Sequence, residues 1–361
     1  MPTPSIHQFV AGYANFDAIS NEVRTLRAIF RSWGAPTSHV FAEKRRIHPE
    51  FHAEIKDVRD DISLIRPDDI VLLHLSIGCA ANQVFRELNC KKAILYHNIT
   101  PPDFFRGFSE QTATQLADGR RDAASLASVA SVVMADSQFN ADELAAWGYP
   151  PATVLPLVLD FDNFSQNASR STVRTFSDGL TNILFVGRCA PNKRIEDLVA
   201  AFYYYQHYIN PSSRFIHAGS YADADQYRVL LLTRIKALKL ENFLSVGSVP
   251  QAELNAYYKT AHVFLCLSEH EGFCIPLIEA MANNVPVAAY AAGAVPETMD
   301  GAGVLFHAKD YAMIAETIDR LARPTPLRAA VLAAQAERLA RYKATDLAGI
   351  LRHALAPRLP A

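Results

Sequence analysis

The sequence predicts an α/β protein built from two doubly wound domains with parallel sheets. Short aliphatic runs alternate with helix-forming segments through both halves of the chain, and this alternation is typical of parallel strands joined by crossover helices. The runs lack a strict period of two, which indicates strands covered on both faces. At 361 residues, the chain is long enough for two separate cores.

The first half begins with an apolar run at 6–12 that ends at Gly12, followed by a predicted helix over 17–33. Its apolar stripe consists of Ile19, Val23, Leu26 and Phe30. Further strands are expected at 69–76, 92–99, 131–137 and 153–159. The stretch 160–181 is rich in Ser, Asn and Asp and has no sustained apolar period, so it predicts the domain boundary. We therefore expect an N-terminal domain over 1–165 and a C-terminal domain over 166–361.

The second half repeats the pattern. Strands are expected at 182–188, 214–220, 243–248, 263–268, 286–292 and 303–307. The stretch 327–356 is rich in Ala, Leu and Arg and predicts a terminal helix, which we expect can pack back on the N-terminal domain. Ligands of doubly wound sheets bind beyond the carboxyl ends of the strands, so the sequence predicts a cleft between the two halves.

Composition narrows the function. A net charge of −2 gives no support to nucleic-acid binding, which depends on clustered Lys and Arg. The five cysteines form no CxxC pair, which favours buried thiols in a reducing compartment over disulfides or a zinc site. No signal segment or run of membrane-spanning length is evident. We expect a cytoplasmic protein that at most rests on a membrane surface.

The loop SEHEGFCIPLIE, residues 268–279, is the central functional candidate. It follows an apolar run and leads into a helix whose first turn contains Pro276. The N–H groups of that turn and the helix dipole suit an anion such as a diphosphate. Of the two acids Glu271 and Glu279, one could then meet a sugar while the other meets the ribose of the same nucleotide. Two glutamates at this spacing also occur by chance, so the pattern requires support from other residues.

Two cations give that support. Arg188 and Lys193 flank the loop GRCAPNK between a strand and a helix, where a fork and a point charge suit a diphosphate. The alternative is a solvated turn. His97 ends the strand KAILYHNI, where it would face the cleft, although a lone histidine is often a satisfied core residue. His74 we interpret as core. No histidine pair has metal-ligand spacing, so no metal site is expected.

A membrane contact is a weaker hypothesis. Three phenylalanines surround Arg106 in the segment 101–108, and Arg24, Arg27 and Arg31 lie on one face of the first predicted helix. Together these residues suit a membrane surface or a lipid-phosphate acceptor. Ordinary loop anchoring and a solvated helix face are the favoured alternative.

These motifs resemble glycosyltransferase family 4, the retaining enzymes of the GT-B fold. The family's paired glutamates lie in a loop similar to EGFCIPLIE, with Cys274 where glycine is frequent. The resemblance extends over the segments FVGRCAPNKRIEDLVAAF, VGSVPQAELNAYYKTAHVFLCLS and AAGAVPETMDGAGVLF, and more loosely over the first half. It implies two facing, doubly wound Rossmann-like domains with an interdomain cleft. The segments EHEGFCIPLIEAMA and YHNITPP are similar in sequence to segments of bacterial transferases that build O-antigen and other surface polysaccharides. Several of these transferases move mannose.

The resemblance also implies residue roles. Arg188 and Lys193 would hold the donor diphosphate, and Glu271 would bind donor sugar hydroxyls. Glu279 would accept from the ribose, and His97 would contact the sugar from the other domain. The remaining donor-site positions that the matching segments imply are Gly187, Val249, Gly272, Phe273 and Cys274. The first loop carries ANFD where the family has small residues, which leaves the acceptor side undefined.

The expected protein is a retaining, metal-independent hexosyltransferase of lipopolysaccharide synthesis, with GDP-mannose as the best-matched donor and no further cofactor. Its expected partners are the nucleotide-sugar, a glycan or lipid-linked acceptor and the cytoplasmic face of the inner membrane. Alternatives are a UDP- or dTDP-sugar donor carrying glucose, N-acetylglucosamine or rhamnose, a related epimerase or phosphorylase, and an inactive scaffold. A scaffold would be expected to lack Glu271, Arg188 or Lys193, and all three are present.

Overall fold

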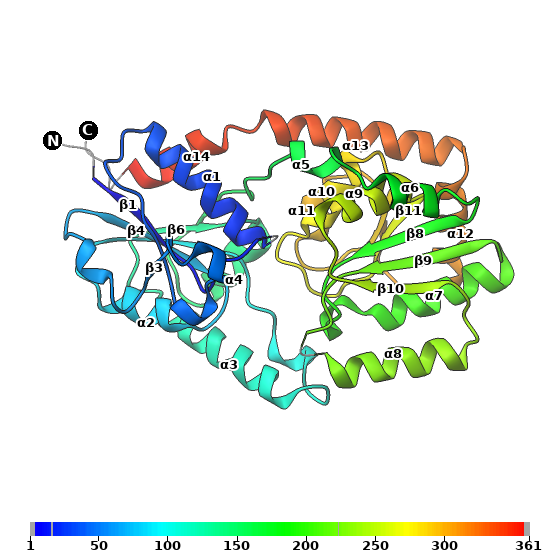
Figure 1. Cartoon of the computed structure of the whole chain (residues 1–361), viewed down its shortest axis with the longest axis horizontal. Coiled ribbons are helices and arrows are strands. Elements are labelled where there is room, and N and C mark those ends of the chain that lie inside the picture. Colours follow the sequence, from blue (N-terminus) through cyan, green and yellow to red (C-terminus); the bar gives the residue numbers. More distant parts are fainter. Residues whose placement is uncertain (1–3, 16, 223, 357–361) are drawn as a thin grey trace. The chain divides into compact units, whose positions relative to one another are not determined.

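A computed structural model describes residues 4–15, 17–222 and 224–356. The chain divides into two compact units. Unit 1 contains the described residues of 1–102, 113–159 and 346–361, and unit 2 contains 103–112 and 160–345. Each unit is a parallel sheet with helices on both faces, so the predicted α/β class with two doubly wound domains is confirmed (Figure 1).

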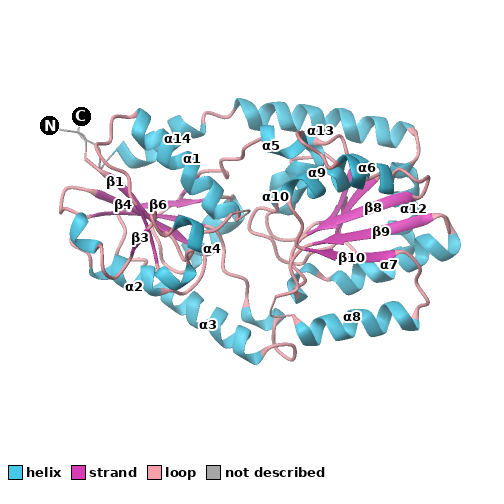
Figure 2. Cartoon of the chain, in the orientation of Figure 1, coloured by secondary structure: helices cyan, strands magenta, loops and turns pink. Residues whose placement is uncertain are grey.

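Unit 1 contains a seven-stranded sheet in the order β3-β2-β1-β4-β5-β6-β7. Its strands are β1 (Ile6–Phe9), β2 (Val40–Ala42), β3 (Lys56–Asp57), β4 (Ile70–Leu75), β5 (Lys91–Tyr96), β6 (Val132–Ala135) and β7 (Thr153–Val154). Its helices are α1 (Ala18–Ser32), α2 (Ala80–Glu87), most of α3 (Glu110–Ser125), α4 (Gln138–Ala146) and α14 (Leu347–Leu355), as Figure 2 shows. Short 3₁₀ turns lie at Lys44–Arg46, Pro49–Phe51, Ile62–Leu64 and Pro102–Phe104.

The sheet of unit 1 separates two apolar cores. Along β4, Val71 and Leu73 belong to the core beneath α2 and α3, whereas Ile70 and Leu72 belong to the core beneath α1 and α14. This alternation is the period of a strand buried on both faces. It explains why the segment reads as a continuous apolar run in the sequence.

Unit 2 contains a six-stranded sheet in the order β10-β9-β8-β11-β12-β13. Its strands are β8 (Thr181–Val186), β9 (Ser213–Ala218), β10 (Phe243–Gly247), β11 (Val263–Cys266), β12 (Val287–Tyr290) and β13 (Val304–Phe306). Its helices are α5 (Asp162–Ser165), α6 (Arg170–Phe176), α7 (Ile195–Tyr208), α8 (Asp225–Ala237), α9 (Gln251–Thr260), α10 (Ile275–Ala282), α11 (Val295–Met299), α12 (Tyr311–Ala322) and α13 (Pro326–Ala344). In Figure 1, α7 and α8 lie on one side of this sheet and α9, α10 and α13 on the other.

Strand order places one switch point in each sheet. In unit 1 the order reverses between β1 and β4, and in unit 2 it reverses between β8 and β11. Loops on the two sides of a switch point diverge and leave a crevice at the carboxyl ends of the strands, where ligands of such sheets bind. In unit 2 these loops are the one after β8, with Arg188 and Lys193, and the one after β11, with Glu271.

The structure differs from the sequence predictions at short or broken elements. Strands β2 and β3 were not predicted, because they span three and two residues and are separated by 3₁₀ turns. The expected terminal helix is two helices, α13 and α14, and α14 begins after Asp346, whose side chain caps it. Leu351 and Leu355 of α14 belong to the core of unit 1.

The segment proposed for membrane contact packs inside unit 2. Phe105 is buried, the Phe104 ring lies 5.9 Å from the His270 ring, and the Phe108 ring lies 5.2 Å from the Tyr227 ring. These aromatic surfaces are therefore used within the fold. Among the described residues, no helix combines the length and apolar character that crossing a bilayer requires.

Two glycines allow α3 to approach the loop after β4 in unit 1. A Cβ at Gly119 would lie 2.8 Å from the Gly78 nitrogen, and a Cβ at Gly78 would lie 2.9 Å from the Gly119 Cα. Both contacts are with backbone, which cannot move aside cheaply. The close packing of α3 therefore depends on the absence of side chains at both positions.

We expect Gly119→Ala to lower the free energy of unfolding by about 2 kcal/mol, because overpacking outweighs the gain in helix propensity. Thr114→Ala, at an exposed position of the same helix, is the control and should change stability little. Urea unfolding followed by circular dichroism measures both. Equal stability of the Gly119→Ala variant and the wild type would contradict the role of this contact.

Candidate active site

The loops after β8 and β11 in unit 2 are joined by two hydrogen bonds, one between backbone groups and one from a side chain. The Glu269 N–H donates to the Asn192 carbonyl at 2.9 Å, and the Asn192 side chain donates to the His270 carbonyl at 3.1 Å. The two loops are neighbours because β8 pairs with β11. This connection brings the cationic loop and the acidic loop, which are far apart in sequence, to one place.

Lys193 and Glu271 meet at the centre of this junction. The Lys193 ammonium donates to the Glu271 carboxylate at 2.7 Å, and the side chains are 20% and 9% exposed. Burial by itself would lower the pKa of Lys193, but attraction to the Glu271 carboxylate outweighs it and raises that pKa. Lys193 is therefore a fixed cation at this position. The sequence predicted both residues, and the structure brings them together.

Arg188 lies at the carboxyl end of β8 with an exposed side chain. Its guanidinium makes no hydrogen bond or ion pair with another described residue. The backbone beneath it is held firmly: Gly187 donates to the Ala218 carbonyl and its own carbonyl accepts from His217, both at 2.9 Å. A Cβ at Gly219 would lie 1.9 Å from the Gly187 oxygen, so this approach requires glycine.

The acidic loop enters α10 through a left-handed residue. Cys274, the N-cap of α10, has φ of 71°, a conformation that favours glycine, and Pro276 occupies the first turn. Phe273 and Cys274 have buried side chains, and the Phe273 carbonyl accepts from the Thr298 hydroxyl at 2.5 Å. Phe273 and Cys274 can therefore face a ligand only through backbone groups, and we expect the same of Gly272. The start of α10 supplies a partial positive charge.

Gly293 holds the acidic loop from the other side. Its φ is +57°, and a Cβ there would lie 2.4 Å from the Glu271 carbonyl oxygen. The same carbonyl accepts from the Ala294 N–H at 2.9 Å. The sequence analysis did not identify Gly293, although a glycine directly after a strand, in the run AAGA, signals a close backbone approach.

Glu279 lies one turn into α10 and pairs with Tyr258 of α9. The Tyr258 hydroxyl donates to the Glu279 carboxylate at 2.7 Å. Burial raises the pKa of Glu279 to about 7, although the Tyr258 hydrogen bond lowers it in part. Val249, the other predicted donor-site residue of this region, is half-buried in the loop between β10 and α9. Tyr258 was missed because its contact with Glu279 arises only in the folded chain.

A second charged group braces the acidic loop. Lys309 donates to Asp197 at 2.5 Å and to Glu269 at 2.7 Å. Arg194, at φ 50°, lies 3.2 Å from Asp197 and 3.4 Å from Glu269. Glu269 directly precedes the loop that carries Glu271, so these contacts fix the loop at its base. No spacing in the sequence indicates this network.

His97 belongs to a buried polar network in unit 1. Its imidazole is 4% exposed and lies 3.5 Å from Glu22 and 3.5 Å from Asp136. Burial by itself would lower the pKa of His97, yet the two carboxylates outweigh it and raise that pKa. Burial raises the pKa of Glu22 to about 7. The structure thus places His97 among acids, and its contact with a donor sugar stays a prediction.

Hydrogen bonds in this network assign the protons. The Gln8 amide nitrogen donates to the Val23 carbonyl at 3.1 Å, so its oxygen accepts from His74 Nε2 at 3.0 Å. His74 Nδ1 is then the acceptor for His97 Nε2–H, again at 3.0 Å. His74 is buried, as the sequence analysis interpreted it, and it orients the His97 ring.

Two groups of described residues each bring three potential metal-ligand atoms within 4.8 Å of one another. They are Glu22, His74 and His97 in unit 1, and Cys266, Glu271 and Cys274 in unit 2. In both groups the charged members already have partners: His97 and Glu22 face each other, and Glu271 pairs with Lys193. A reaction without metal stays a prediction.

The arrangement in unit 2 defines the class of site. The fixed ammonium of Lys193 contacts Glu271 shortly before the start of α10, and the exposed guanidinium of Arg188 lies at the carboxyl end of β8. Such cations near a helix N-terminus suit a diphosphate. Two carboxylates, Glu271 and Glu279, are hydrogen-bond acceptors for hydroxyl groups. This combination suits a nucleotide-sugar.

Comparisons with known proteins identify the fold of the chain and a family match within unit 2. Anabaena HepE in complex with UDP and glucose matches with a TM-score of 0.73 at 17% identity, over 98% of this chain and 99% of that chain. Sucrose-phosphate synthase from Thermosynechococcus elongatus matches with a TM-score of 0.72 at 18% identity, over 98% and 99%. The GT-B type of fold is thereby confirmed. Residues 172–338, which lie in unit 2, match the model of the family described as glycosyl transferases group 1.

Each of three curated relatives matches this chain over less than half of its own length. The alpha-monoglucosyldiacylglycerol synthase of Acholeplasma laidlawii is 34% identical over 37% of this chain and 35% of its own. The GDP-mannose-dependent alpha-mannosyltransferase of Mycolicibacterium smegmatis is 31% identical over 46% and 41%. The D-inositol 3-phosphate glycosyltransferase of Frankia alni is 36% identical over 30% and 28%. The chain thus spans between about a quarter and two fifths of these relatives.

We expect Cys274→Gly to be more stable than Cys274→Ala by about 1 kcal/mol, because only the alanine keeps a Cβ in the left-handed conformation. Both variants lose the thiol, so their difference isolates the backbone. At an ordinary helical position the order is reversed. Urea unfolding of the two variants is the measurement, and an alanine variant as stable as the glycine variant would contradict the strained backbone.

Glu279→Gln should stabilise the ligand-free protein at pH 8, by on the order of 1 kcal/mol. In the unfolded chain Glu279 ionises near its ordinary pKa of 4.5, and in the native state it ionises near pKa 7. The native state therefore loses stability relative to the glutamine variant as pH rises from 4.5 to 7, and the difference vanishes below pH 4.5. Unfolding of both proteins across pH 4–8 measures it.

Glu316→Gln, exposed on α12, is the matched control for the loss of one surface carboxyl group, and a surface substitution of this kind changes stability little. A Glu279→Gln variant whose stability relative to wild type is the same at pH 4 and pH 8 would show that Glu279 titrates normally. Glu22 titrates equally in both proteins, so its contribution cancels.

Proposed function

We propose that this protein is a glycosyltransferase that moves a hexose from a nucleotide-sugar to a glycan or lipid-linked glycan acceptor. The observation that carries the proposal is the 2.7 Å contact between Lys193 and Glu271 beside the start of α10. It sets a cation for a diphosphate and a carboxylate for sugar hydroxyls at one switch point. The family match over residues 172–338 supports the same class.

In this proposal each donor-site residue has one role. Arg188 and Lys193 bind the diphosphate, with backbone groups of Gly272, Phe273 and Cys274 nearby. Glu271 accepts hydrogen bonds from the donor sugar. Glu279, already oriented by Tyr258, accepts from the ribose. Gly187 and Val249 lie beside the bound nucleotide. His97, whose ring is oriented by the hydrogen-bond network of unit 1, contacts the donor sugar.

The chemistry follows from where charge develops. When the bond between the sugar and the nucleotide breaks, negative charge grows on the leaving phosphate and positive charge grows on the sugar ring. Lys193, Arg188 and the helix terminus stabilise the first charge, and preorganised electrostatics of this kind is usually the largest catalytic contribution. We assign the role of covalent nucleophile to no carboxylate among the described residues. We therefore propose front-face transfer with retention, in which the leaving phosphate takes the acceptor proton and no metal is required.

GDP-mannose is the donor we propose first. Support comes from the similarity of the acidic loop to mannose-transferring enzymes and from the Mycolicibacterium relative, named for GDP-mannose. A UDP-sugar is the alternative, favoured by the HepE structure with UDP-glucose. Synthesis of bacterial surface polysaccharide at the cytoplasmic face of the inner membrane is the setting we propose. An inactive scaffold is disfavoured because Arg188, Lys193 and Glu271 are all present.

The test is thermal stabilisation by GDP, UDP and dTDP and their sugars, because a ligand that binds only the native state raises its stability with concentration. We expect the largest increase in Tm with GDP and GDP-mannose. A larger increase with UDP would assign the donor to UDP-sugars. No increase with any nucleotide would overturn the proposed function.

Glu271→Gln should lower the rate of sugar transfer by about 100-fold, while stabilisation by the nucleoside diphosphate persists. The diphosphate remains bound because Arg188, Lys193 and Glu279 are unchanged. Glu316→Gln is the matched control. Turnover is measured with the donor found above, and NMR of the product reads the anomeric configuration. Wild-type turnover of the Glu271→Gln variant would contradict the role of Glu271. A product of inverted anomeric configuration would contradict transfer with retention.

A further inference from the structure

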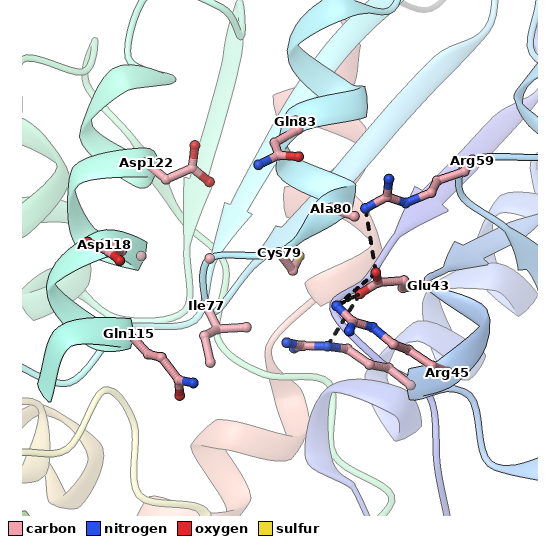
Figure 3. A pocket seen from close by; sticks show the side chains of 13 residues that line it. Glu43, Arg45, Arg59, Ile77, Cys79, Ala80, Gln83, Gln115, Asp118 and Asp122 are labelled. Atoms are coloured by element: carbon pink, nitrogen blue, oxygen red, sulfur yellow. Dashed lines mark hydrogen bonds and ion pairs between the residues drawn. The ribbon is translucent and has the colours of Figure 1, made fainter. Parts of the chain in front are cut away.

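Unit 1 contains a pocket of about 420 Å³, and none of the residues that line it belongs to the proposed donor site. It is lined by the loops that follow β2, β3 and β4 and by one face of α3 (Figure 3). These loops lie at the carboxyl ends of strands beside the switch point between β1 and β4, which is the edge where such sheets bind ligands. Its volume lies in the range of small-molecule sites, roughly 300–1,000 Å³.

One wall of the pocket is cationic. Arg45, Arg46 and Arg59 converge on the single carboxylate of Glu43, with contacts of 3.0, 3.5 and 3.6 Å (Figure 3). Glu43 is 11% exposed, whereas Arg45 and Arg59 are 75% and 61% exposed. Three guanidinium groups around one acid leave an excess of about two positive charges at the pocket surface. Guanidinium forks bind phosphate through paired hydrogen bonds.

The cationic wall is held in place by backbone contacts. The Arg46 carbonyl accepts from the Tyr13 N–H at 3.0 Å, and a Cβ at Gly12 would lie 2.9 Å from the same oxygen. The Lys44 N–H donates to the Asp57 carboxylate at 2.9 Å. The loops after β1, β2 and β3 are thereby fixed relative to one another, which orients the arginines before any ligand arrives.

The opposite wall is suited to hydroxyl groups. Asp118 pairs with Arg121, and Asp122 accepts from Asn82 and Arg86 at 2.8 and 2.9 Å, so these acids are neutralised on their own side. They do not cancel the charge of the arginine wall. Gln83 and Gln115, which also line the pocket, have exposed amides without a hydrogen bond to another described residue. Amide groups both donate to and accept from sugar hydroxyls, whereas carboxylates accept from them.

We infer that this pocket binds a phosphorylated sugar or polyol, with the phosphate on the arginine wall and the ring hydroxyls on the wall of α2 and α3. A phosphate monoester carries about −1.5 to −2 charges near pH 7, which matches the excess of the arginine wall. Its role as the acceptor site rests on the proposed function. The pocket lining includes Ile77 in the loop after β4, and Leu75, the last residue of β4, accepts through its carbonyl from the His97 N–H at 2.9 Å.

The test uses the full chain and isothermal titration calorimetry with four probes: glucose 6-phosphate, glucose, glucuronate and inorganic phosphate. We expect glucose 6-phosphate to bind at least about tenfold more tightly than each of the others, because only it engages both walls. Glucose or glucuronate bound as tightly as glucose 6-phosphate would overturn the inference. Inorganic phosphate bound as tightly as glucose 6-phosphate would also overturn the inference, because the wall of α2 and α3 would then contribute nothing to binding.

Variants locate the binding. The double variant Arg45→Gln/Arg59→Gln should weaken glucose 6-phosphate binding by about tenfold or more. Glu43→Gln should bind it as tightly as wild type or more tightly, an outcome that a damaged pocket would not give. Arg66→Gln is the matched control, because Arg66 precedes β4 and so lies at the opposite edge of the sheet, and it should bind normally. An unchanged double variant would contradict the site.

Binding to lipid vesicles distinguishes a lipid-borne phosphate from the phosphate of a free sugar. Co-sedimentation with phosphatidylcholine vesicles that contain phosphatidylinositol 4-phosphate, whose headgroup carries a phosphate monoester, would assign a lipid-borne phosphate if it is lost in the double variant. Binding of glucose 6-phosphate without such co-sedimentation would assign a free sugar phosphate. Nucleotide stabilisation is measured in parallel. Stabilisation without glucose 6-phosphate binding overturns only this inference, and glucose 6-phosphate binding without nucleotide stabilisation overturns only the proposed function.

Discussion

The ion pair between Lys193 and Glu271 is the interaction on which the candidate site depends. Both side chains are largely withdrawn from water, so each charge is tolerable only because the other is present. Removing one partner would leave an uncompensated charge at the junction of two loops. The surrounding contacts, from Asn192 to Gly293 and Lys309, can be understood as the means by which the fold keeps the pair in place.

This pair also explains why the site lies where it does. Lys193 and Glu271 are 78 residues apart in sequence, and they meet because β8 and β11 are neighbours at the switch point. Unit 1 repeats the principle, since its arginine pocket adjoins the switch point between β1 and β4. Each sheet therefore concentrates charge at the edge where its topology leaves room.

Much of the fold was predictable because buried parallel strands are strong local signals. The runs before Gly187 and Ser268 each read as a strand that ends in a loop, and both strands are present. Strands β2 and β3 were not predictable because they are too short to carry a pattern. Their loops carry Arg45 and Arg59, so the pocket of unit 1 was hidden from the sequence together with them.

The site was predictable only in part, for a related reason. Spacing and residue type indicated Arg188, Lys193, Glu271 and Glu279, because each follows a recognisable strand or starts a helix. Tyr258, the partner of Glu279, could not be found in this way, and neither could Glu22 and Asp136, the partners of His97. In each case the partners lie on a different element from the residue they contact. Sequence patterns give the first contacts of a ligand more readily than the side chains that orient them.

The raised pKa values of Glu22 and Glu279 make folding a proton-consuming process near neutral pH. Both groups have a pKa of about 7 in the native state and an ordinary value of 4.5. At pH 7 each is about half protonated when folded and ionised when unfolded, so folding takes up about one proton through these two groups. The apparent enthalpy of unfolding at this pH therefore includes the ionisation heat of the buffer, and the charge of the native protein is less negative than its composition indicates.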